Sequence, residues 1–348
     1  MVTTLDTAPA LDRATPWSRR LTVLVLVALA VLLAAELATR AIEAHLEAPL
    51  EWQSYETQTK VSQMDALGKH GGADIVFLGS SLMDTGLEPT IFDGQLGGHV
   101  VGYNAALSSS IPRMTEPWAQ YVVVPKLHPK VIVLGLDSYD FTDEGPGRTA
   151  FLDAFLASPG ARHAMGRSDV LQRFDRWLDG HSALWDHRFQ LRDPETLADA
   201  VLGRRPVEDP EAAAVEPDGR QSFDQDLPFA NRVVGGDLPV GDWSLGTLDP
   251  AAVDRLIRFA RSRGIKVVLV DMPVTNDYVA RHPHGEADYE TFIAAVQALA
   301  TRDGATVVDL DGLRDHSLFA DEVHLNKHGA QVFSTQLAAA LAPEHLIT

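Results

Sequence analysis

The chain contains no cysteine among its 348 residues. This absence excludes disulfides, thiolate metal sites and cysteine nucleophiles. Basic side chains are also scarce: 29 Lys and Arg stand against 48 Asp and Glu, and the formal net charge at pH 7 is -19. Because nucleic-acid binding depends on basic patches that meet phosphates, this balance argues against a nucleic-acid partner.

Two nucleotide-binding motifs are missing as well. No G-x-x-x-x-G-K-[ST] P-loop occurs, and no G-x-G-x-x-G follows an apolar run of strand length. The sequence therefore predicts no nucleotide cofactor, and we assign it no other cofactor.

What the chain does contain is one long apolar run, LTVLVLVALAVLLAAELA, from Leu21 to Ala38, with a single charge at Glu36. About 20 apolar residues in a helix span the hydrocarbon core of a bilayer. Arg19 and Arg20 precede the run, and positive charges favour the cytoplasmic side. The sequence predicts a single-pass protein of the cell membrane, with a cytoplasmic N-terminus and an extracytoplasmic main domain.

Two other interpretations of this run stay open. Small residues such as Ala34 and Ala38 could support cleavage of a signal peptide. The run could also be the buried core helix of a cytoplasmic protein. As an anchor, it divides the chain into a cytoplasmic tail (1–18), a transmembrane helix (19–40), a juxtamembrane linker and helix (41–70), and a main domain (71–348).

Short apolar runs recur through the main domain, and each is near-continuously apolar rather than alternating. That pattern is typical of a parallel sheet buried on both faces. Helical stretches lie between the runs, which favours βαβ units and an α/β fold, a three-layer α/β/α sandwich around a five-stranded parallel sheet. The runs are DIVFLGS (74–80), HVVGYN (99–104), KVIVLGLD (130–137), IKVVLVDMP (265–273) and ATVVDLD (305–311).

Two helices carry end signals. The first has Asp249 as its expected N-cap, Pro250 in its first turn and Gly264 as its stop. The second ends at Gly304. Between the third and fourth runs, residues 143–246 form an insertion, with some helix expected near 149–200 and irregular chain near 203–245. An insertion of this length suggests a lid, a cap or a substrate-recognition region, and its aromatics indicate that part of it packs on the core.

Polar residues that follow the strands are candidates for chemistry, because ligands of open α/β sheets bind at the carboxyl ends of the strands. Ser80 and Ser81 follow the first run, in DIVFLGSSL. A serine at this position is either a helix N-cap or a nucleophile. Asp321 and His324 follow the last run, in DEVH. At this spacing a carboxylate can hold the imidazole that takes a proton from a serine.

Taken together, these two blocks resemble those of the SGNH/GDSL hydrolase superfamily. GSSL is similar to the family's Gly-Asp-Ser-Leu block, with Ser81 in the nucleophile position and Ser80 in place of Asp. DEVHLNKHGAQVF is similar to the family's last block, which implies that Asp321 and His324 complete a catalytic triad. The resemblance covers roughly 70–142 and 247–345 and implies a flavodoxin-like sheet.

The middle blocks depart from the family pattern. Asn104 and then Ala105 stand where the family has a glycine that gives an oxyanion donor. In GLDSYDF, Tyr139 stands where the family has Asn, and Asp140 follows it. We expect oxyanion donors at the Ser81 backbone and near Asn104 or Ala105, with Asp140 at the border of the site.

The anchor and the GSS block also resemble the membrane-anchored branch, which includes alginate-acetylation and D-alanylation factors. The resemblance implies an extracytoplasmic serine esterase or O-acyltransferase acting on acyl esters of cell-envelope carbohydrate. Its expected partners are an acylated carbohydrate or small ester and envelope-assembly proteins. The departures in the middle blocks favour an alternative, a weak or inactive SGNH-fold protein that binds carbohydrate or scaffolds an envelope assembly.

Other polar groups give weaker signals. His282 and His284 form an H-x-H pair, but no third ligand accompanies it, so we predict no metal site. Arg113 could meet a charged substrate or form a surface salt bridge. An acidic cluster lacks the spacing and glycine of an EF-hand loop, and consists of Asp137, Asp140, Asp143 and Glu144.

Overall fold

A computed structural model describes residues 16–342, except for 48, 144, 146–147, 169, 180, 189, 205–209, 222–239 and 311. The chain forms two compact units. The first comprises Met1–Pro49 and Asp169–Val207, and the second comprises Leu50–Ser168 and Glu208–Thr348. Most of the predicted tail, Glu144, and much of the expected irregular stretch lie outside the described residues.

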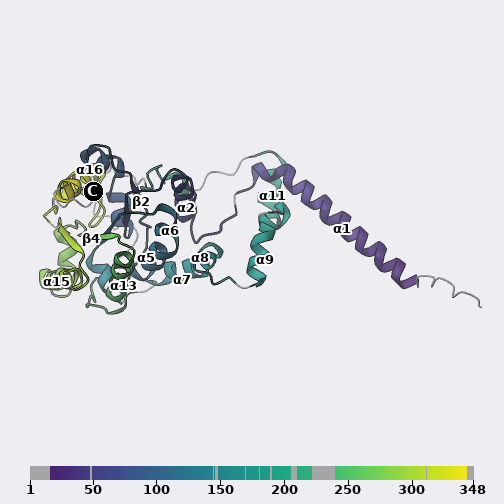
Figure 1. The fold of residues 1–348 in the computed structure, drawn as a ribbon. Helices are drawn as coiled ribbons and strands as arrows, with labels where there is room; N and C mark the ends of the chain where they lie inside the picture. Colours follow the sequence, from purple (N-terminus) through teal and green to yellow (C-terminus); the bar gives the residue numbers. More distant parts are fainter. Residues whose placement is uncertain are drawn as a thin grey trace, which may run out of the picture. The chain divides into compact units, whose positions relative to one another are not determined.

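The second unit is built on a five-stranded parallel sheet in the order β2-β1-β3-β4-β5 (Figure 1). Every residue of the adjacent strands β2, β1 and β3 is buried, as the near-continuous apolar runs predict. The predicted fold class and all five strands are confirmed. The strands are β1 (Ile75–Leu78), β2 (Gly102–Asn104), β3 (Val131–Leu136), β4 (Lys266–Asp271) and β5 (Thr306–Asp309).

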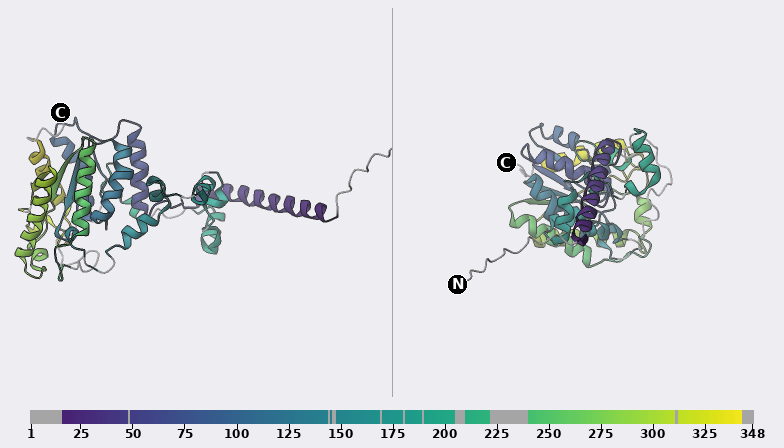
Figure 2. Two further views of the ribbon diagram at one scale, coloured as in Figure 1. Left: turned by 60° about the horizontal axis from the view of Figure 1, so that its bottom comes forward. Right: turned by 90° about the vertical axis from the view of Figure 1, so that its right-hand side faces the viewer.

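Helices flank this sheet and complete the layers (Figure 2). A π-helical turn, Ala119–Val123, joins two of them, and short 3₁₀ turns follow β3 and β5 at Ser138–Phe141 and His316–Leu318. The helices are α2 (Tyr55–Gly68), α3 (Ser81–Gly86), α4 (Pro89–Gln95), α5 (Pro112–Trp118), α6 (Val124–Leu127), α7 (Ala150–Ala157), α8 (Pro159–Ala164), α12 (Pro210–Ala213), α13 (Leu248–Ser262), α14 (Asn276–Ala280), α15 (Glu286–Asp303) and α16 (Lys327–Leu341).

The start of α13 differs from the prediction. Asp249 is not its N-cap; it lies in the first turn, fully buried, and binds two arginines. The cap comes instead from Asp143, whose carboxylate accepts hydrogen bonds from the N–H groups of Thr247 and Leu248. Burial alone would raise the pKa of Asp143, but these backbone donors outweigh it and lower the pKa. The helix is thus capped by a side chain about a hundred residues earlier.

The insertion contributes to both units. In the second unit Phe155 of α7 is fully buried and packs between Trp52 and Trp118, with ring centroids 6.2 and 6.3 Å away. This contact accounts for part of the expected aromatic packing. Phe174 and Trp177, by contrast, belong to the first unit and are exposed.

The first unit contains the long apolar helix α1 (Pro16–Ile42) and a short 3₁₀ turn, Glu43–His45. The segment Arg19–His45 is long and apolar enough to cross a membrane, and a signal sequence would satisfy the same criteria. None of its most apolar 18-residue window is buried, so α1 is not a core helix in this structure. Its described residues also form three shorter helices and a 3₁₀ turn: α9 (Val170–Asp179), α10 (Ala183–Asp186), Gln190–Arg192 and α11 (Pro194–Val201).

Candidate active site

The turn between β1 and α3 holds Ser81 at the first position of a helix, directly beyond the carboxyl end of a strand. Ser80 is the N-cap of that helix, and its side chain accepts from Leu82 N–H. Gly79 precedes it with φ of 148°. A Cβ at Gly79 would lie 2.9 Å from the carbonyl oxygen of Gly135 on β3. Only glycine allows this turn to approach the neighbouring strand so closely.

Asp321 and His324 lie in the loop between β5 and α16, and backbone contacts fix its shape. Phe319 and Leu325 form an isolated antiparallel bridge, and Ala320 N–H donates to the His324 carbonyl at 2.8 Å. One carboxylate oxygen of Asp321 accepts from the N–H of Val323 at 2.9 Å and of His324 at 2.7 Å. The loop is thereby closed around the aspartate.

These three side chains form one chain of hydrogen bonds. The second carboxylate oxygen of Asp321, Oδ2, lies 2.9 Å from His324 Nδ1. His324 Nε2 lies 2.9 Å from Ser81 Oγ. Asp321 and His324 are buried, with 1% and 9% of their surface exposed, whereas Ser81 is half-buried. The structure therefore brings together the three residues that the sequence predicts as a triad, although Ser81 and His324 are 243 positions apart.

The electrostatics keep Asp321 ionised beside the imidazole. Burial raises the pKa of its carboxyl, but the hydrogen bond and charge of His324 and the two backbone donors outweigh burial and leave the pKa below its usual value. An ionised carboxylate on Nδ1 orients the ring and leaves Nε2 toward Ser81. This is an arrangement that can activate a hydroxyl for attack on a carbonyl.

Asn104 and Ala105, expected to supply an oxyanion donor, have their N–H groups engaged elsewhere. The Asn104 side-chain Nδ2 donates to the carbonyls of Met83, Asp84 and Leu87, at and just beyond the end of α3, at 2.9 to 3.2 Å. The Asn104 backbone N–H donates to the carbonyl of Asp218 at 2.9 Å. The Ala105 N–H donates to the carbonyl of Phe77 at 2.9 Å. These bonds leave neither group for an oxyanion in this structure, and Asn104 instead fixes the helix that carries Ser81.

The loop that follows β2 has an unusual backbone conformation at Ser109, an exposed turn residue. Ser109 has φ of 63°, in the left-handed region that non-glycine residues rarely adopt. Leu107 N–H donates to the Gly79 carbonyl at 3.2 Å and ties this loop to the turn that carries Ser81. Within the described part of the chain, the N–H groups of Ser109 and Ser81 have no acceptor. The sequence signal was only a run of three serines after an apolar strand.

Asp140 is held in a capping box rather than directed by any hydrogen bond to the triad. Its N–H donates to the Asp137 carboxylate at 3.0 Å, and its own carboxylate accepts from the Asp137 N–H at 3.2 Å. Burial, then the charge of Asp137, raise the pKa of Asp140 well above its usual value. Its observed contacts are those of a structural cap at the end of β3.

The remaining candidates are also structural. His282 is buried and its Nε2 lies 2.8 Å from Ser138 Oγ, whereas His284 is exposed and contacts Asp288. Among the described residues no group of three or more His, Asp or Glu could hold a metal ion. Arg113 lies 3.0 Å from the buried Asp249, so it forms an ion pair that is shielded on one side.

A fully buried lysine contacts α3, the helix that carries Ser81. Lys60 of α2 contacts Asp84 of α3 and the Ala106 carbonyl, each at 2.5 Å, and Glu56 at 3.2 Å. Ser108 Oγ donates to the other oxygen of Asp84 at 3.0 Å. This network joins α2, the nucleophile helix and the 105–110 loop, and none of its members stood out in the sequence.

Glu56 makes the network sensitive to pH. Burial, then the charge of Asp84, raise the pKa of the Glu56 carboxyl to about 8, with Lys60 opposing them. The unfolded chain releases this proton near pH 4, so folding stability falls as pH rises from there to about 8. Glu56→Gln mimics the protonated form. Its melting temperature relative to wild type should rise between pH 5 and pH 9.

The control for this substitution is Glu286→Gln, because the Glu286 side chain is 56% exposed. Its difference from wild type should stay flat with pH. A flat difference for Glu56→Gln as well would mean that Glu56 is ionised in the folded protein throughout this range.

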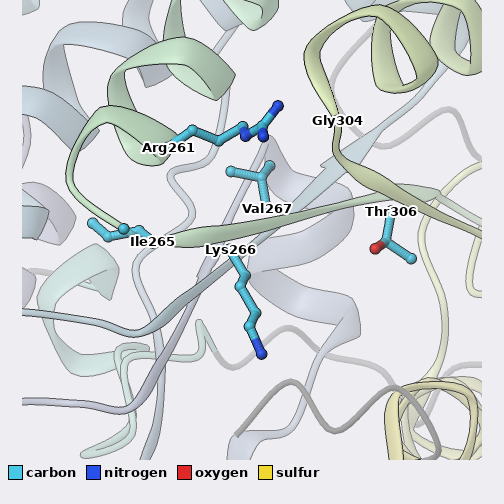
Figure 3. Close-up of a pocket in the computed structure, with 7 residues that line it drawn as sticks. Arg261, Ile265, Lys266, Val267, Gly304 and Thr306 are labelled. Atoms are coloured by element: carbon cyan, nitrogen blue, oxygen red, sulfur yellow. The ribbon is translucent and has the colours of Figure 1, made fainter.

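A pocket of about 290 Å³ lies at the opposite end of the sheet from the triad (Figure 3). Lys266 and Thr306, the first residues of β4 and β5, line it together with Arg261 and Gly304. The Arg261 guanidinium is already engaged by the Asp303 carbonyl. The pocket is therefore separate from the candidate active site, which lies at the carboxyl ends of the strands.

No protein-family model matches the chain, and no curated protein matches it. Its fold is similar to solved structures of esterases and acylhydrolases. An acetyl xylan esterase is 13% identical, with 77% of this chain and 98% of that chain covered and a TM-score of 0.39. A GDSL-like lipase from Bacteroides thetaiotaomicron is 10% identical, with 84% and 100% covered and a TM-score of 0.40. An inhibitor-bound aryl esterase from M. smegmatis is 11% identical, with 78% and 99% covered and a TM-score of 0.36. Such distant similarities assign no activity, which must come from the site itself.

Proposed function

We propose that this protein is a serine esterase or O-acyltransferase that uses Ser81, His324 and Asp321. The observation that carries the proposal is the continuous hydrogen-bond chain from the Asp321 carboxylate through the imidazole to Ser81 Oγ, with both links at 2.9 Å. Burial of the aspartate and imidazole beneath a half-buried serine suits a nucleophile that a substrate can reach.

In the first step Ser81 Oγ attacks the ester carbonyl carbon while His324 Nε2 takes the hydroxyl proton. Asp321 stabilises the imidazolium that forms. The carbon–oxygen bond to the leaving alcohol then breaks, and His324 returns the proton to the departing oxygen. The product of this step is an acyl group on Ser81.

The oxyanion of the intermediate needs donors that are not already engaged. Ser81 N–H and Ser109 N–H meet this requirement within the described residues. The left-handed backbone of Ser109 supports a functional constraint at this position, since such strain persists where surrounding structure enforces it. Backbone donors beside the substrate carbonyl would stabilise the charge that develops in the transition state.

In the second step an acceptor hydroxyl attacks the acyl group, and His324 again takes the proton and returns it to Ser81 Oγ. Water as acceptor gives an esterase, and a sugar hydroxyl gives a transferase. We propose acyl esters of cell-envelope carbohydrate as the substrate class. The apolar helix α1, which would hold the protein at the outer face of the cell membrane, supports this choice.

Labelling with a fluorophosphonate probe tests the proposal. The folded wild-type protein should form a covalent adduct on Ser81, because the probe reacts with a serine that an adjacent base activates. Ser81→Ala should lose all labelling, whereas Ser80→Ala should keep it. In a structure of the adduct, the phosphonyl oxygen should lie within hydrogen-bond distance of the N–H groups of Ser81 and Ser109.

Folded protein that does not label would count against the enzyme and favour the alternative, a catalytically inactive protein that binds carbohydrate or scaffolds an envelope assembly. The engagement of Asn104 and Ala105 is the observation behind that alternative.

A further inference from the structure

The helix α9 presents an apolar face that no described element of the first unit covers. Val170, Leu171, Phe174 and Trp177 follow helical spacing, and between 54% and 77% of each side chain is exposed. The rings of Phe174 and Trp177 stack at a centroid distance of 5.9 Å, and His181 stacks on Trp177 at 4.8 Å. The surfaces of soluble proteins seldom expose so many large apolar side chains together, so we expect lipid or another protein to cover this face.

Contacts within the first unit hold the end of α9 beside α1. Glu36 of α1 accepts hydrogen bonds from Ser182 Oγ at 2.8 Å and from the N–H groups of Ala183 and Leu184 at 3.0 Å. Arg40, one turn further along α1, donates to the His181 carbonyl at 3.0 Å. His181 and Ser182 in turn donate to the carbonyl of Leu178 in α9.

These contacts fix the level of α9 along the anchor. Glu36 lies two residues before the end of the apolar run at Ala38, which is about 3 Å along a helix. The apolar residues on the preceding turns, such as Leu32 and Leu33, are exposed. The turn between α9 and α10 is therefore held within a few ångströms of the point where the apolar surface of α1 ends.

The direction of α9 fits this level. Figure 1 and the left view of Figure 2 show α9 running across α1 rather than alongside it. A helix that crosses a membrane anchor at the end of its apolar run lies along the bilayer surface. Trp is enriched at this depth, where its ring meets both the acyl chains and the polar headgroups.

We infer that α9 is an interfacial helix that inserts its Val170–Leu171–Phe174–Trp177 face between the headgroups of the same bilayer that α1 spans. The inference rests on the proposed membrane anchor. We assign lipid as the occupant of the face because Glu36 holds the turn after α9 close to the level where the apolar run of α1 ends. The insertion between the third and fourth strands thus supplies a second membrane attachment.

The absence of cysteine makes a site-directed test clean. The full-length protein, in vesicles of phosphatidylethanolamine and phosphatidylglycerol, carries a nitrobenzoxadiazole label on a single introduced cysteine. The test positions are Phe174→Cys and Leu171→Cys on the face. Gln172→Cys is the matched control, because position 172 lies about 160° from Phe174 around the helix. Leu29→Cys reports on the anchor.

Labels at 174 and 171 should emit further to the blue than the label at 172. Lipids with a nitroxide near the headgroup should quench them several-fold more strongly, and iodide in the water should quench them less. The label at 29 should instead be quenched best by a nitroxide at the bilayer centre.

Each contrary outcome is distinct. Equal iodide quenching at 174 and 172, with 29 in the bilayer, overturns the interfacial helix and leaves the anchor intact. Shielding of 174 in native membranes without quenching by lipid nitroxides means that a protein covers the face, and also overturns it. If lipid nitroxides do not quench the label at 29, α1 is not a membrane anchor and this inference fails. The fluorophosphonate test of Ser81 is unaffected by that result.

Discussion

Ser81→Ala is expected to lower kcat/KM for an activated ester by on the order of 10⁶-fold, because the nucleophile and its base act as one unit. Asp321→Asn should cost roughly 10⁴-fold, since the amide would hold the imidazole in the wrong tautomer. Ser80→Ala should stay within about tenfold of wild type, because the loss of an N-cap typically costs only about 1 kcal/mol of stability. Hydrolysis of p-nitrophenyl acetate by purified, folded protein measures all three.

The contrast between the two serines decides the assignment. If Ser80→Ala were as inactive as Ser81→Ala, either Ser80 would be the nucleophile or the turn would collapse without its cap. Circular dichroism and melting temperature separate these outcomes, because a collapsed turn lowers stability and a lost nucleophile does not.

Lys60→Met is expected to destabilise the protein by about 3–5 kcal/mol, because it leaves the buried Asp84 carboxylate without its cation. Lys60 and Asp84 are both fully buried, so water cannot replace the lost contact. For a unit of this size the change corresponds to a fall of roughly 10 °C in melting temperature. Differential scanning fluorimetry of the detergent-solubilised protein measures it.

Two variants control for the loss of a lysine as such. Lys130→Met removes an exposed pair with Asp74 and should cost about 1 kcal/mol or less. Lys60→Met combined with Asp84→Asn should recover part of the loss, because no buried charge then stands alone. A single Lys60→Met variant as stable as Lys130→Met would mean that Asp84 is protonated or hydrated in the folded protein.

The fold was accessible from the sequence because its signals are local. A run such as KVIVLGLD predicts by itself a strand that is buried on both faces, and β3 occupies Val131–Leu136 as expected. Gly304 likewise marks the end of α15, where its φ of 71° suits a residue without a side chain. The pairing of Ser81 with DEVH depended on the order of blocks along the chain rather than on any local rule.

The rest of the site depends on contacts between distant segments, which no local pattern reports. The cap of α13 comes from Asp143, although Asp249 and Pro250 form a plausible local start. The left-handed backbone of Ser109 is set by its loop, not by its residue type. Lys60 has the sequence context of an ordinary surface lysine in a mixed-charge helix, and only the packed structure shows that it is buried.

In the proposed membrane-anchored protein, the division of the chain into units has a consequence for release by proteolysis. The polypeptide passes between the two units three times, at Pro49–Leu50, Ser168–Asp169 and Val207–Glu208. A protein on a single stalk is shed by one proteolytic cut. Here a cut at Pro49–Leu50 separates α1 covalently from Ser81, but Asp169–Val207 of the first unit stays joined to the second unit. Release then also requires the loss of non-covalent contacts such as that between Glu36 and Ser182.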